Sequence, residues 1–299
     1  MGAGPRDETV GRPPLRSHEH WIRRAALLTG VAAGAVILSG CTDQVERGWM
    51  PSDRGTTNQT DRIIDLWNGS WVAALAVGVL VWGLTLWCVV AYRRRRGETG
   101  LPVQVRYHLP LEILYTLVPL MMVGVLFFYT ARDQSAIAAT DEKPDLTINV
   151  VGKQWSWDFN YVDDDVYDTG IQAKLDGTPS PETEVPTLYL PVNKRIEFKL
   201  ASRDVIHSFW IPAFLYKLDV IPGVQNKFQV VPQKIGDFKG KCAELCGEYH
   251  SEMLFNVKVV SEADYEAHVA DLRSRGQTGQ LGSDLDRGLT ESSATGSQG

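Results

Sequence analysis

The chain has 299 residues and a formal net charge of −6 at pH 7, with 30 Lys and Arg against 36 Asp and Glu. A mildly acidic chain is a poor match for proteins that bind nucleic acids, which need a basic surface. The length allows one medium-sized domain with additional segments. Three apolar runs lie within residues 1–130, and the rest has the composition of a soluble domain.

The first apolar run has the pattern of a secretory signal. An arginine pair at 23–24 precedes the fourteen uncharged residues Ala25–Leu38, and Leu38–Cys41 has the sequence LSGC. A basic region, a short apolar region and small residues before a cleavage point define such signals. We therefore predict a lipoprotein signal peptide at residues 1–40, with Cys41 as the lipidated residue. An uncleaved anchor is the alternative, although the run is short for a span of about 20 residues.

A polar segment and a second apolar run follow. Residues 41–70 are rich in Asp, Thr, Gly and Asn and are predicted to be an external linker. Trp71–Tyr92 carries no charge over twenty-two residues, and a helix of this length crosses the roughly 30 Å hydrocarbon core of a bilayer. The cluster Arg93–Arg96 comes next, and clusters of this kind remain cytoplasmic.

The third apolar run, Leu109–Tyr129, returns the chain across the membrane. Residues 71–130 are therefore predicted to form a transmembrane helical hairpin whose turn, residues 93–108, is cytoplasmic. The signal sequence and the arginine cluster give this orientation independently. Glu112 is the one acidic residue of the third run, and an ionisable residue in a span is a functional candidate.

An external domain is predicted from residue 131 to residue 270. Its short segments alternate in polarity or are rich in β-branched residues, and Gly, Pro and Asp clusters separate them, which indicates an all-β sandwich or barrel. Glu262–Arg275 has a helical pattern, and residues 271–299, which are polar and Gly/Ser-rich, are predicted to be disordered. The expected strands are Leu146–Gly152, Thr187–Val192, Arg195–Ser202, Lys227–Pro232 and Leu254–Val260.

The external domain is acidic. Residues 131–270 contain fourteen Lys and Arg against twenty-two Asp and Glu, and Asp163–Asp165 form an acidic run in a predicted loop. Solvation of the surface is the simpler interpretation. The alternative is an acidic face that attracts a basic partner and raises its association rate.

The stretch Cys242–Met253, CAELCGEYHSEM, places two cysteines, a histidine and a methionine within twelve residues. A disulfide between the cysteines is compatible with an external location, but it leaves the histidine and the methionine unexplained. A zinc site fits the cysteine and histidine spacing, but methionine is a poor zinc ligand. Thiolate, thioether and imidazole together favour copper, and two cysteines are able to bridge two copper ions.

A second histidine ligand is expected from elsewhere in the domain. Of its three histidines, His268 lies in the predicted terminal helix and is a poor candidate. His207 follows a predicted strand and precedes Cys242 by thirty-five residues. Alone, His207 would be interpreted as a surface or core histidine. One histidine on an early loop and a later ligand-rich loop is the arrangement of cupredoxins, and the downstream cluster therefore favours His207 as a ligand.

The pattern H-x34-C-x-E-x-C-x3-H-x2-M after two predicted spans resembles subunit II of haem–copper cytochrome c oxidase, in its bacterial form. The resemblance covers about Trp71 to Val260. It also includes the stretches Gly152–Phe159 (GKQWSWDF), Asp204–Pro212 (DVIHSFWIP) and Lys217–Gly223 (KLDVIPG). It implies a cupredoxin Greek-key β-sandwich outside the membrane, anchored by the two-helix hairpin. No C-x-x-C-H haem-attachment motif is present in the sequence.

The resemblance also implies the roles of individual residues. Glu244 would bind copper through its carbonyl and a magnesium ion, at the interface with subunit I, through its carboxylate. Trp155 matches the residue that accepts electrons from cytochrome c, with a core tryptophan as the alternative. Glu112 matches the glutamate at the entrance of a proton pathway. The ligands of the binuclear copper centre, called CuA, would be His207, Cys242, Glu244, Cys246, His250 and Met253.

The implied function is the transfer of electrons from cytochrome c, through CuA, to the haem and copper of subunit I, where oxygen is reduced to water and protons are pumped. The implied partners are oxidase subunits I and III and cytochrome c or a cytochrome c domain of a neighbouring complex, in a bacterial plasma membrane with the copper domain on the outer face. Lys153, Ser156 and Val224 depart from the commonest family residues. A quinol oxidase subunit, which lacks the copper ligands, and a lipid-anchored copper-delivery protein are the alternatives.

Overall fold

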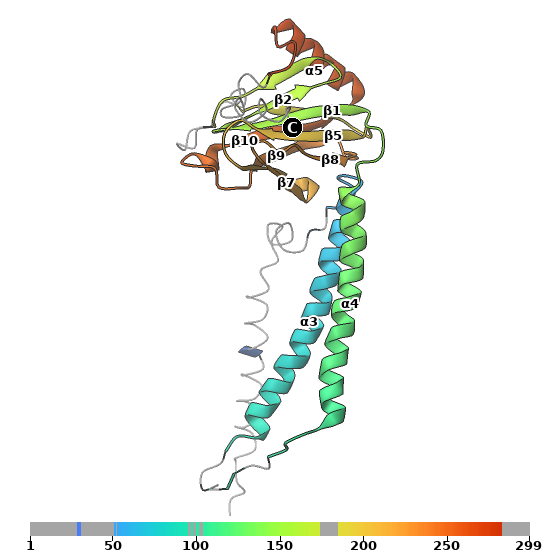
Figure 1. Ribbon diagram of the computed structural model, residues 1–299, viewed down its shortest axis with the longest axis vertical. Coiled ribbons are helices and arrows are strands. Elements are labelled where there is room, and N and C mark those ends of the chain that lie inside the picture. The colour runs from blue at the N-terminus through green and yellow to red at the C-terminus, as the bar shows by residue number, and fades with distance from the viewer. Residues whose placement is uncertain are drawn as a thin grey trace, which may run out of the picture. The chain divides into compact units, whose positions relative to one another are not determined.

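The computed structural model describes residues 29–30, 51, 53–94, 97, 100–101, 104–173 and 185–282 (Figure 1). The chain divides into two units, Met1–Ser52 and Asp53–Gly299, and every element named below belongs to the second. The predicted signal peptide cleavage point and Cys41 lie outside the described residues, as do Arg95 and Arg96 of the arginine cluster.

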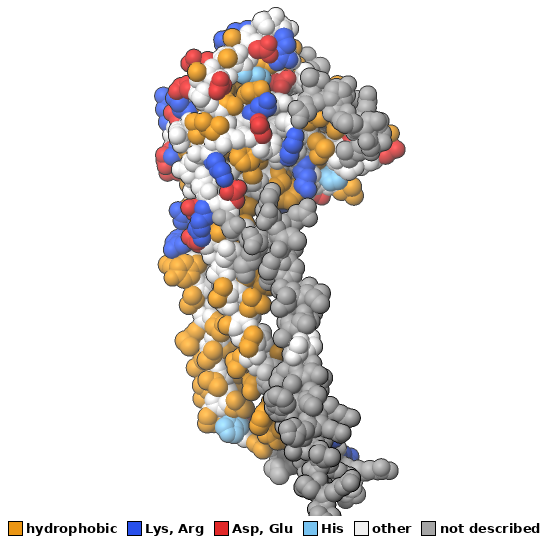
Figure 2. Space-filling model, turned by 180° about the vertical axis from the view of Figure 1, so that it is seen from behind, with side chains coloured by type: hydrophobic (Ala, Val, Ile, Leu, Met, Phe, Trp, Pro, Cys, Tyr) orange, Lys and Arg blue, Asp and Glu red, His pale blue; other side chains and the backbone are white. Residues whose placement is uncertain are grey.

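Two long helices form the predicted hairpin. Helix α3 (Thr60–Ala91) and helix α4 (Leu109–Ala138) are both long and apolar enough to cross a membrane, with mean hydropathies of 2.3 and 2.1 over their most apolar windows. Their surfaces are covered with hydrophobic side chains over most of their length (Figure 2). Such surfaces are stable only in lipid or against other apolar helices.

Both helices extend beyond the predicted spans. Helix α3 begins at Thr60, within the predicted linker 41–70, and α4 continues to Ala138, within the predicted external domain. The apolar run marks only the part that lies in lipid, whereas the polar ends stay helical because their charges pair. Buried Asp133 accepts hydrogen bonds from Arg62 at 3.1 Å and from Arg132 at 2.8 Å.

The segment before α3 binds directly to the external domain. The Asn58 N–H donates to the Val231 carbonyl at 3.0 Å, and the Asn58 side chain accepts from the Val231 N–H at 2.9 Å. Thr57 forms a β-bridge with Pro232. Within the described residues from 53 onwards, the predicted external linker is therefore replaced by a hydrogen-bonded junction.

The external domain is a sandwich of two five-stranded sheets, with strand orders β3-β2-β1-β5-β8 and β4-β10-β9-β6-β7 (Figure 1). This confirms the predicted all-β fold. Most neighbouring strands are antiparallel, but β1 pairs with β5 and β10 pairs with β4 in parallel. The strands are β1 (Leu146–Lys153), β2 (Ser156–Tyr161), β3 (Val166–Thr169), β4 (Thr187–Pro191), β5 (Ile196–Ser202), β6 (His207–Ile211), β7 (Tyr216–Val220), β8 (Asn226–Val230), β9 (Gly236–Cys242) and β10 (Leu254–Val260).

An aromatic core joins the two sheets. Trp157 on β2 packs against Phe209 on β6 and Phe255 on β10, with ring centroids 5.6 and 5.5 Å apart. Phe209 and Phe255 are stacked at 5.0 Å, and all three side chains are buried. Each aromatic ring removes a large apolar area from water, and edge-to-face contacts add to that stabilisation. The loop between β9 and β10 therefore rests on a rigid base.

A buried carboxylate holds the outer face of the first sheet. Asp158 on β2 is fully buried and lies 2.6 Å from the Lys153 ammonium and 3.0 Å from the Arg203 guanidinium. The Thr169 hydroxyl also donates to it. Removal of one partner from a buried ion pair costs about 3–5 kcal/mol. This cluster therefore ties β1, β2 and β3 to the segment that leads into β6.

The C-terminal part is more ordered than predicted. Helix α5 (Glu262–Ser274) matches the expected helix, and the Ser261 hydroxyl accepts from the Asp264 N–H at its start. The predicted disorder from residue 271 is wrong as far as residue 282. The Gly279 N–H donates to the Asp165 carbonyl, and the Leu281 N–H donates to the Asn160 side chain. Composition predicted disorder here because backbone hydrogen bonds to a sheet edge leave no apolar pattern in the sequence.

His268 is a structural residue of α5. Its ring stacks on Tyr189 of β4, with centroids 3.7 Å apart and the planes 13° from parallel. Burial lowers the pKa of His268 to about 4, and the positive charges of Arg275 and Lys258 act in the same direction. The neutral ring is therefore the form that fits the fold.

His268 should make the stability of the domain sensitive to acid. Its pKa of about 4 in the folded chain lies below the ordinary value of 6.5, so the unfolded chain takes up the proton first as the pH falls. The stabilisation that neutral His268 provides is complete above pH 6.5 and is lost between pH 6.5 and 4. Over this range the free energy of unfolding should fall by about 2 kcal/mol, after allowance for partial exposure of the ring. His268→Phe keeps a ring against Tyr189 but cannot titrate. The stability of both proteins is measured by urea unfolding in detergent, followed by tryptophan fluorescence. The free energy of unfolding should fall less on acidification in the variant, and equal decreases would contradict this role.

Candidate metal centre

The ligand loop, residues 242–253, runs from the last residue of β9 to the start of β10. Its ends are held together because the Cys242 N–H donates to the Met253 carbonyl at 3.0 Å. A short 3₁₀ helix, His250–Glu252, turns the chain back towards β10. The Cys246 sulfur consequently lies 3.9 Å from the Cys242 sulfur, 3.8 Å from the Met253 sulfur and 3.5 Å from Nδ1 of His250. The four soft donors of this stretch therefore face one point.

His207 joins this group from a different strand. It begins β6, which pairs with β9 so that Phe209 lies opposite Cys242, and the Ala243 N–H donates to the Ser208 carbonyl at 3.0 Å. Nδ1 of His207 lies 3.9 Å from the Cys242 sulfur. The donor atoms of His207, Cys242 and Cys246 are all within 4.8 Å of one another, and all three residues are buried. Strand pairing thus brings together residues that are far apart in the sequence.

A glycine makes room for the His207 ring. A Cβ atom at Gly152 on β1 would lie 2.9 Å from Cδ2 of His207, closer than real Cβ contacts. The ring can occupy this position only because residue 152 has no side chain. Gly152 belongs to the first sheet and His207 to the second, so the imidazole lies against both layers of the sandwich.

Asp204 sets the orientation of the His207 ring. Its Oδ1 lies 2.7 Å from Nε2 of His207, and its Oδ2 accepts from the Gln154 N–H at 2.7 Å. Desolvation opposes ionisation of Asp204, but the hydrogen bonds from His207, Gln154 and Val205 hold its pKa below the ordinary value. The ionised carboxylate accepts from Nε2, so Nδ1 is the ring nitrogen that faces the thiols. An outer carboxylate on the far nitrogen is the usual support of a metal-binding histidine.

The carbonyl of Glu244 also points into the site. It lies 3.2 Å from the Cys242 sulfur, whereas the residue as a whole is exposed. The backbone and the side chain of Glu244 can therefore serve different partners. The cysteines themselves are free, and their sulfurs at 3.9 Å are much farther apart than the roughly 2 Å of a disulfide bond.

The two thiols cannot both ionise easily without a cation. Burial opposes ionisation of Cys242, but hydrogen bonds from His207 and from neighbouring backbone lower its pKa to about 7. Burial, followed by the charge of Cys242, raises the pKa of Cys246 to about 12. Metal ions bound to both sulfurs would therefore favour the doubly ionised form. Five side-chain donors and one carbonyl exceed the four ligands of a structural zinc site, and their soft character fits copper.

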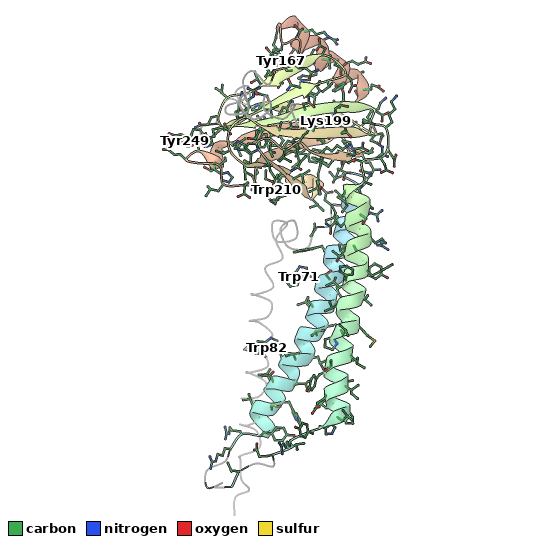
Figure 3. All side chains as sticks on the ribbon, viewed as in Figure 1. Trp71, Trp82, Tyr167, Lys199, Trp210 and Tyr249 are labelled. Atoms are coloured by element: carbon green, nitrogen blue, oxygen red, sulfur yellow. The ribbon has the colours of Figure 1, made fainter. Side chains whose placement is uncertain are left out.

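Trp155 lies beside the ligand loop. It is half-buried, its indole N–H donates to the Cys246 carbonyl at 3.3 Å, and its ring meets the edge of Tyr249 at 4.9 Å. Tyr249 lies at an edge of the sandwich (Figure 3), and Leu245 nearby is 77% exposed. Trp155 thus lies between the exposed surface at Tyr249 and Leu245 and the backbone carbonyl of Cys246, a predicted metal ligand.

Glu112 is not part of this site. It lies in the first turn of α4, where its carboxylate accepts from the His108 N–H at 3.1 Å, while Nδ1 of His108 accepts from the Leu111 N–H at 3.3 Å. These reciprocal hydrogen bonds cap the helix. The role predicted for Glu112 in a proton pathway therefore stays a prediction.

Sequence reasoning gave no role to Asp204 or Gln154. Both occur in stretches that carry the family resemblance, but neither is a residue type that marks a metal site by itself. An aspartate three residues before a candidate ligand is a signal that could have identified Asp204 as its support. Nothing in the sequence indicates that Gln154 meets both Asp204 and the ligand loop.

The sequence is similar to those of known proteins. Residues 146–260 match the family model described as cytochrome C oxidase subunit II, periplasmic domain. A Streptomyces coelicolor protein named "Probable cytochrome c oxidase subunit 2" is 50% identical over 293 residues, which cover 86% of this chain and 90% of that protein. Cytochrome c oxidase subunit 2 of Mycobacterium tuberculosis is 35% identical, over 83% of this chain and 81% of that protein.

A solved structure is also similar. The periplasmic domain of subunit II of the Bradyrhizobium japonicum cytochrome oxidase is 33% identical and matches 46% of this chain and 99% of that domain, with a TM-score of 0.41.

Titration of the metal-free chain should show one thiolate in the site near neutral pH. Because the pKa of Cys242 is about 7 and that of Cys246 about 12, thiolate absorbance in the ultraviolet should rise by one group as the pH increases through 7. Cys242→Ser should remove this step and Cys246→Ser should keep it. The measurement uses reduced, anaerobic protein in which Cys41 and Cys88 are replaced by serine. A step that follows Cys246 would contradict the assignment.

Proposed function

The chain belongs to the cytochrome c oxidase subunit II family, and on this basis we propose that its ligand loop and His207 hold a binuclear copper centre that accepts electrons from cytochrome c. The observation that supports the proposal best is the convergence of two buried cysteine sulfurs, 3.9 Å apart, with His207, His250, Met253 and the Glu244 carbonyl around them. Two thiolates between two metal ions would satisfy all these donors at once.

When bound, the copper pair that these residues would hold would supply one-electron transfer. The chain contributes rigidity and exclusion of water. Asp204 fixes the His207 ring, and the Met253 carbonyl is held by the Cys242 N–H and by the Trp157 indole N–H at 3.4 Å. Cys242, Cys246 and Met253 are each less than 5% exposed, which keeps the donors out of bulk water.

Electrons are proposed to enter at Trp155. The ring of Trp155 reaches the exposed side of the loop at Tyr249 and donates to the Cys246 carbonyl. This arrangement supports a short path from a docked cytochrome c, or a cytochrome c domain of a neighbouring complex, to a copper ligand. The acidic balance of residues 131–270 would favour the approach of a basic donor.

The remaining proposed roles are those that the family resemblance and the signal-like N-terminal pattern imply. The exposed carboxylate of Glu244 would bind magnesium at the interface with subunit I, and subunit III would complete the core of the complex. Oxygen reduction to water and proton pumping would take place in subunit I, with Glu112 at the cytoplasmic entrance of a proton pathway. The complex would lie in the plasma membrane with the sandwich outside, and Cys41 would carry a lipid anchor.

The copper centre should be visible by spectroscopy. The full-length chain, purified in detergent and loaded with copper, should bind two copper ions per chain and give a purple, mixed-valence EPR signal of one electron shared by two metals. His207→Ala should abolish that signal. Metal analysis gives the number of copper ions per chain, and EPR on the same sample gives the mixed-valence signal. A blue spectrum of one copper, or selective uptake of zinc, would contradict the proposed function.

Met253→Leu tests the thioether ligand. Leucine has a similar volume and keeps the fully buried position filled, so the cost in stability should stay below about 1.5 kcal/mol. The reduction potential of the copper centre should shift and electron transfer from cytochrome c should slow several-fold. Met122→Leu makes the same change on α4, away from the loop, and should leave both unchanged. Equal potentials and rates in the two variants would exclude Met253 as a ligand.

A further inference from the structure

The carbonyl of Cys246 is bound from outside the ligand loop by two neighbouring residues. The side-chain amide of Gln154 donates to it at 2.8 Å, and the indole N–H of Trp155 donates to it at 3.3 Å. A carbonyl oxygen has two lone pairs, and these two donors use both. Cys246 is the central residue of the loop, because its sulfur contacts Cys242, His250 and Met253. Its peptide is therefore fixed from the turn between β1 and β2.

Gln154 also contacts the other side of the centre through its backbone. Its N–H donates to Oδ2 of Asp204, whose Oδ1 meets Nε2 of His207. Gln154 thus makes two hydrogen bonds. Its N–H donates to Asp204, which orients His207, and its side chain donates to the Cys246 carbonyl. These contacts connect residues 50 and 92 positions apart in the sequence. Nothing else described so far links the histidine on β6 to the middle of the ligand loop in this way.

The fit between Gln154 and the loop is close. Gly247, which follows Cys246, has φ = +124°, a backbone conformation that favours glycine. A Cβ atom there would lie 3.2 Å from Nε2 of Gln154 and 3.2 Å from Nε1 of Trp155. A side chain at residue 247 would push both donors away from the Cys246 carbonyl. Gly247 therefore permits both the turn and the close approach of the Gln154 and Trp155 side chains to the Cys246 carbonyl.

We propose that Gln154 is a positioning residue that joins the two halves of the metal centre, since its side chain fixes the Cys246 peptide and its N–H fixes Asp204 and, through it, His207. The link to copper rests on the proposed function, whereas the two hydrogen bonds are properties of the metal-free chain. In its described contacts Gln154 reaches Asp204 and the Cys246 carbonyl rather than a proposed metal ligand atom. It acts by restricting how far the loop can move relative to β6.

Hydrogen exchange of the metal-free chain in detergent tests the link directly. Gln154→Glu has the same shape but cannot donate, and Gln154→Leu removes the polar group. In both variants the amides of His250 and Glu252, which donate to the Gly247 and Tyr249 carbonyls, should exchange about five- to tenfold faster, as expected for the loss of one hydrogen bond. The Asn256 amide, which donates to the Pro186 carbonyl, should be unaffected. Gln225→Leu, at an exposed turn residue, should change none of these rates.

A double-mutant cycle separates positioning from simple packing. Trp155→Phe removes the second donor to the same carbonyl. Either single change leaves the Cys246 carbonyl with one partner, whereas the double change leaves it with none, so the combined rise in exchange should exceed the product of the single effects. Independent effects that simply multiply would overturn the proposal, because they would show that Gln154 and Trp155 do not share an acceptor.

The copper-loaded chain gives a second and independent result. Gln154→Glu should release copper to a chelator several-fold faster than the unaltered chain and should alter the EPR splitting, while Gln225→Leu should do neither. Unchanged exchange together with unchanged copper release would overturn the role of Gln154 and leave the copper function standing. Failure of the unaltered chain to take up copper would overturn the proposed function, and the exchange data would still decide the role of Gln154.

Discussion

The metal centre depends on the pairing of β6 with β9. Only Phe209 with Cys242 and Trp210 with Lys241 form this ladder, yet it decides that His207 meets a cysteine thirty-five residues away. Alternate residues of a strand face opposite sides of a sheet, so a slip of one residue would turn His207 towards solvent. The aromatic core protects the register, because Phe209 fits between Trp157 and Phe255 only when it faces inwards.

The ligand loop is stabilised mainly by its neighbours. Its ends are closed by the hydrogen bond between Cys242 and Met253, but its centre is fixed by Gln154 and Trp155 from the turn of the opposite sheet. In the proposed function, a site supported in this way would lose little energy to rearrangement when an electron arrives or leaves. The same support explains why buried donors remain close together although the pKa values of the two thiols oppose joint ionisation.

The sequence predicted the membrane hairpin, five strands and the terminal helix, because apolar runs and alternating polarity are visible in the sequence. It also predicted the candidate metal-binding residues, because most of them lie close together in one stretch. The helix ends were missed because paired charges such as Asp133 look like linker residues in a sequence. The second strand was missed although Trp157, Phe159 and Tyr161 alternate with three polar residues, all of which the structure buries. Asp204 and Gln154 could not be assigned because their roles depend on contacts between sheets. The strands not predicted are β2, β3, β6, β7 and β9.

The junction at Asn58 has a consequence for the rate of electron transfer. Because Asn58 is bonded to Val231 and α3 begins at Thr60, there is almost no slack between the membrane anchor and the sandwich. Electron tunnelling weakens exponentially with distance, so a loosely tethered copper domain would spend much of its time too far from its acceptor. For the proposed electron transfer, the short junction would act as a spacer of fixed length, so the number of residues between the anchor and the sandwich would matter as well as their identity.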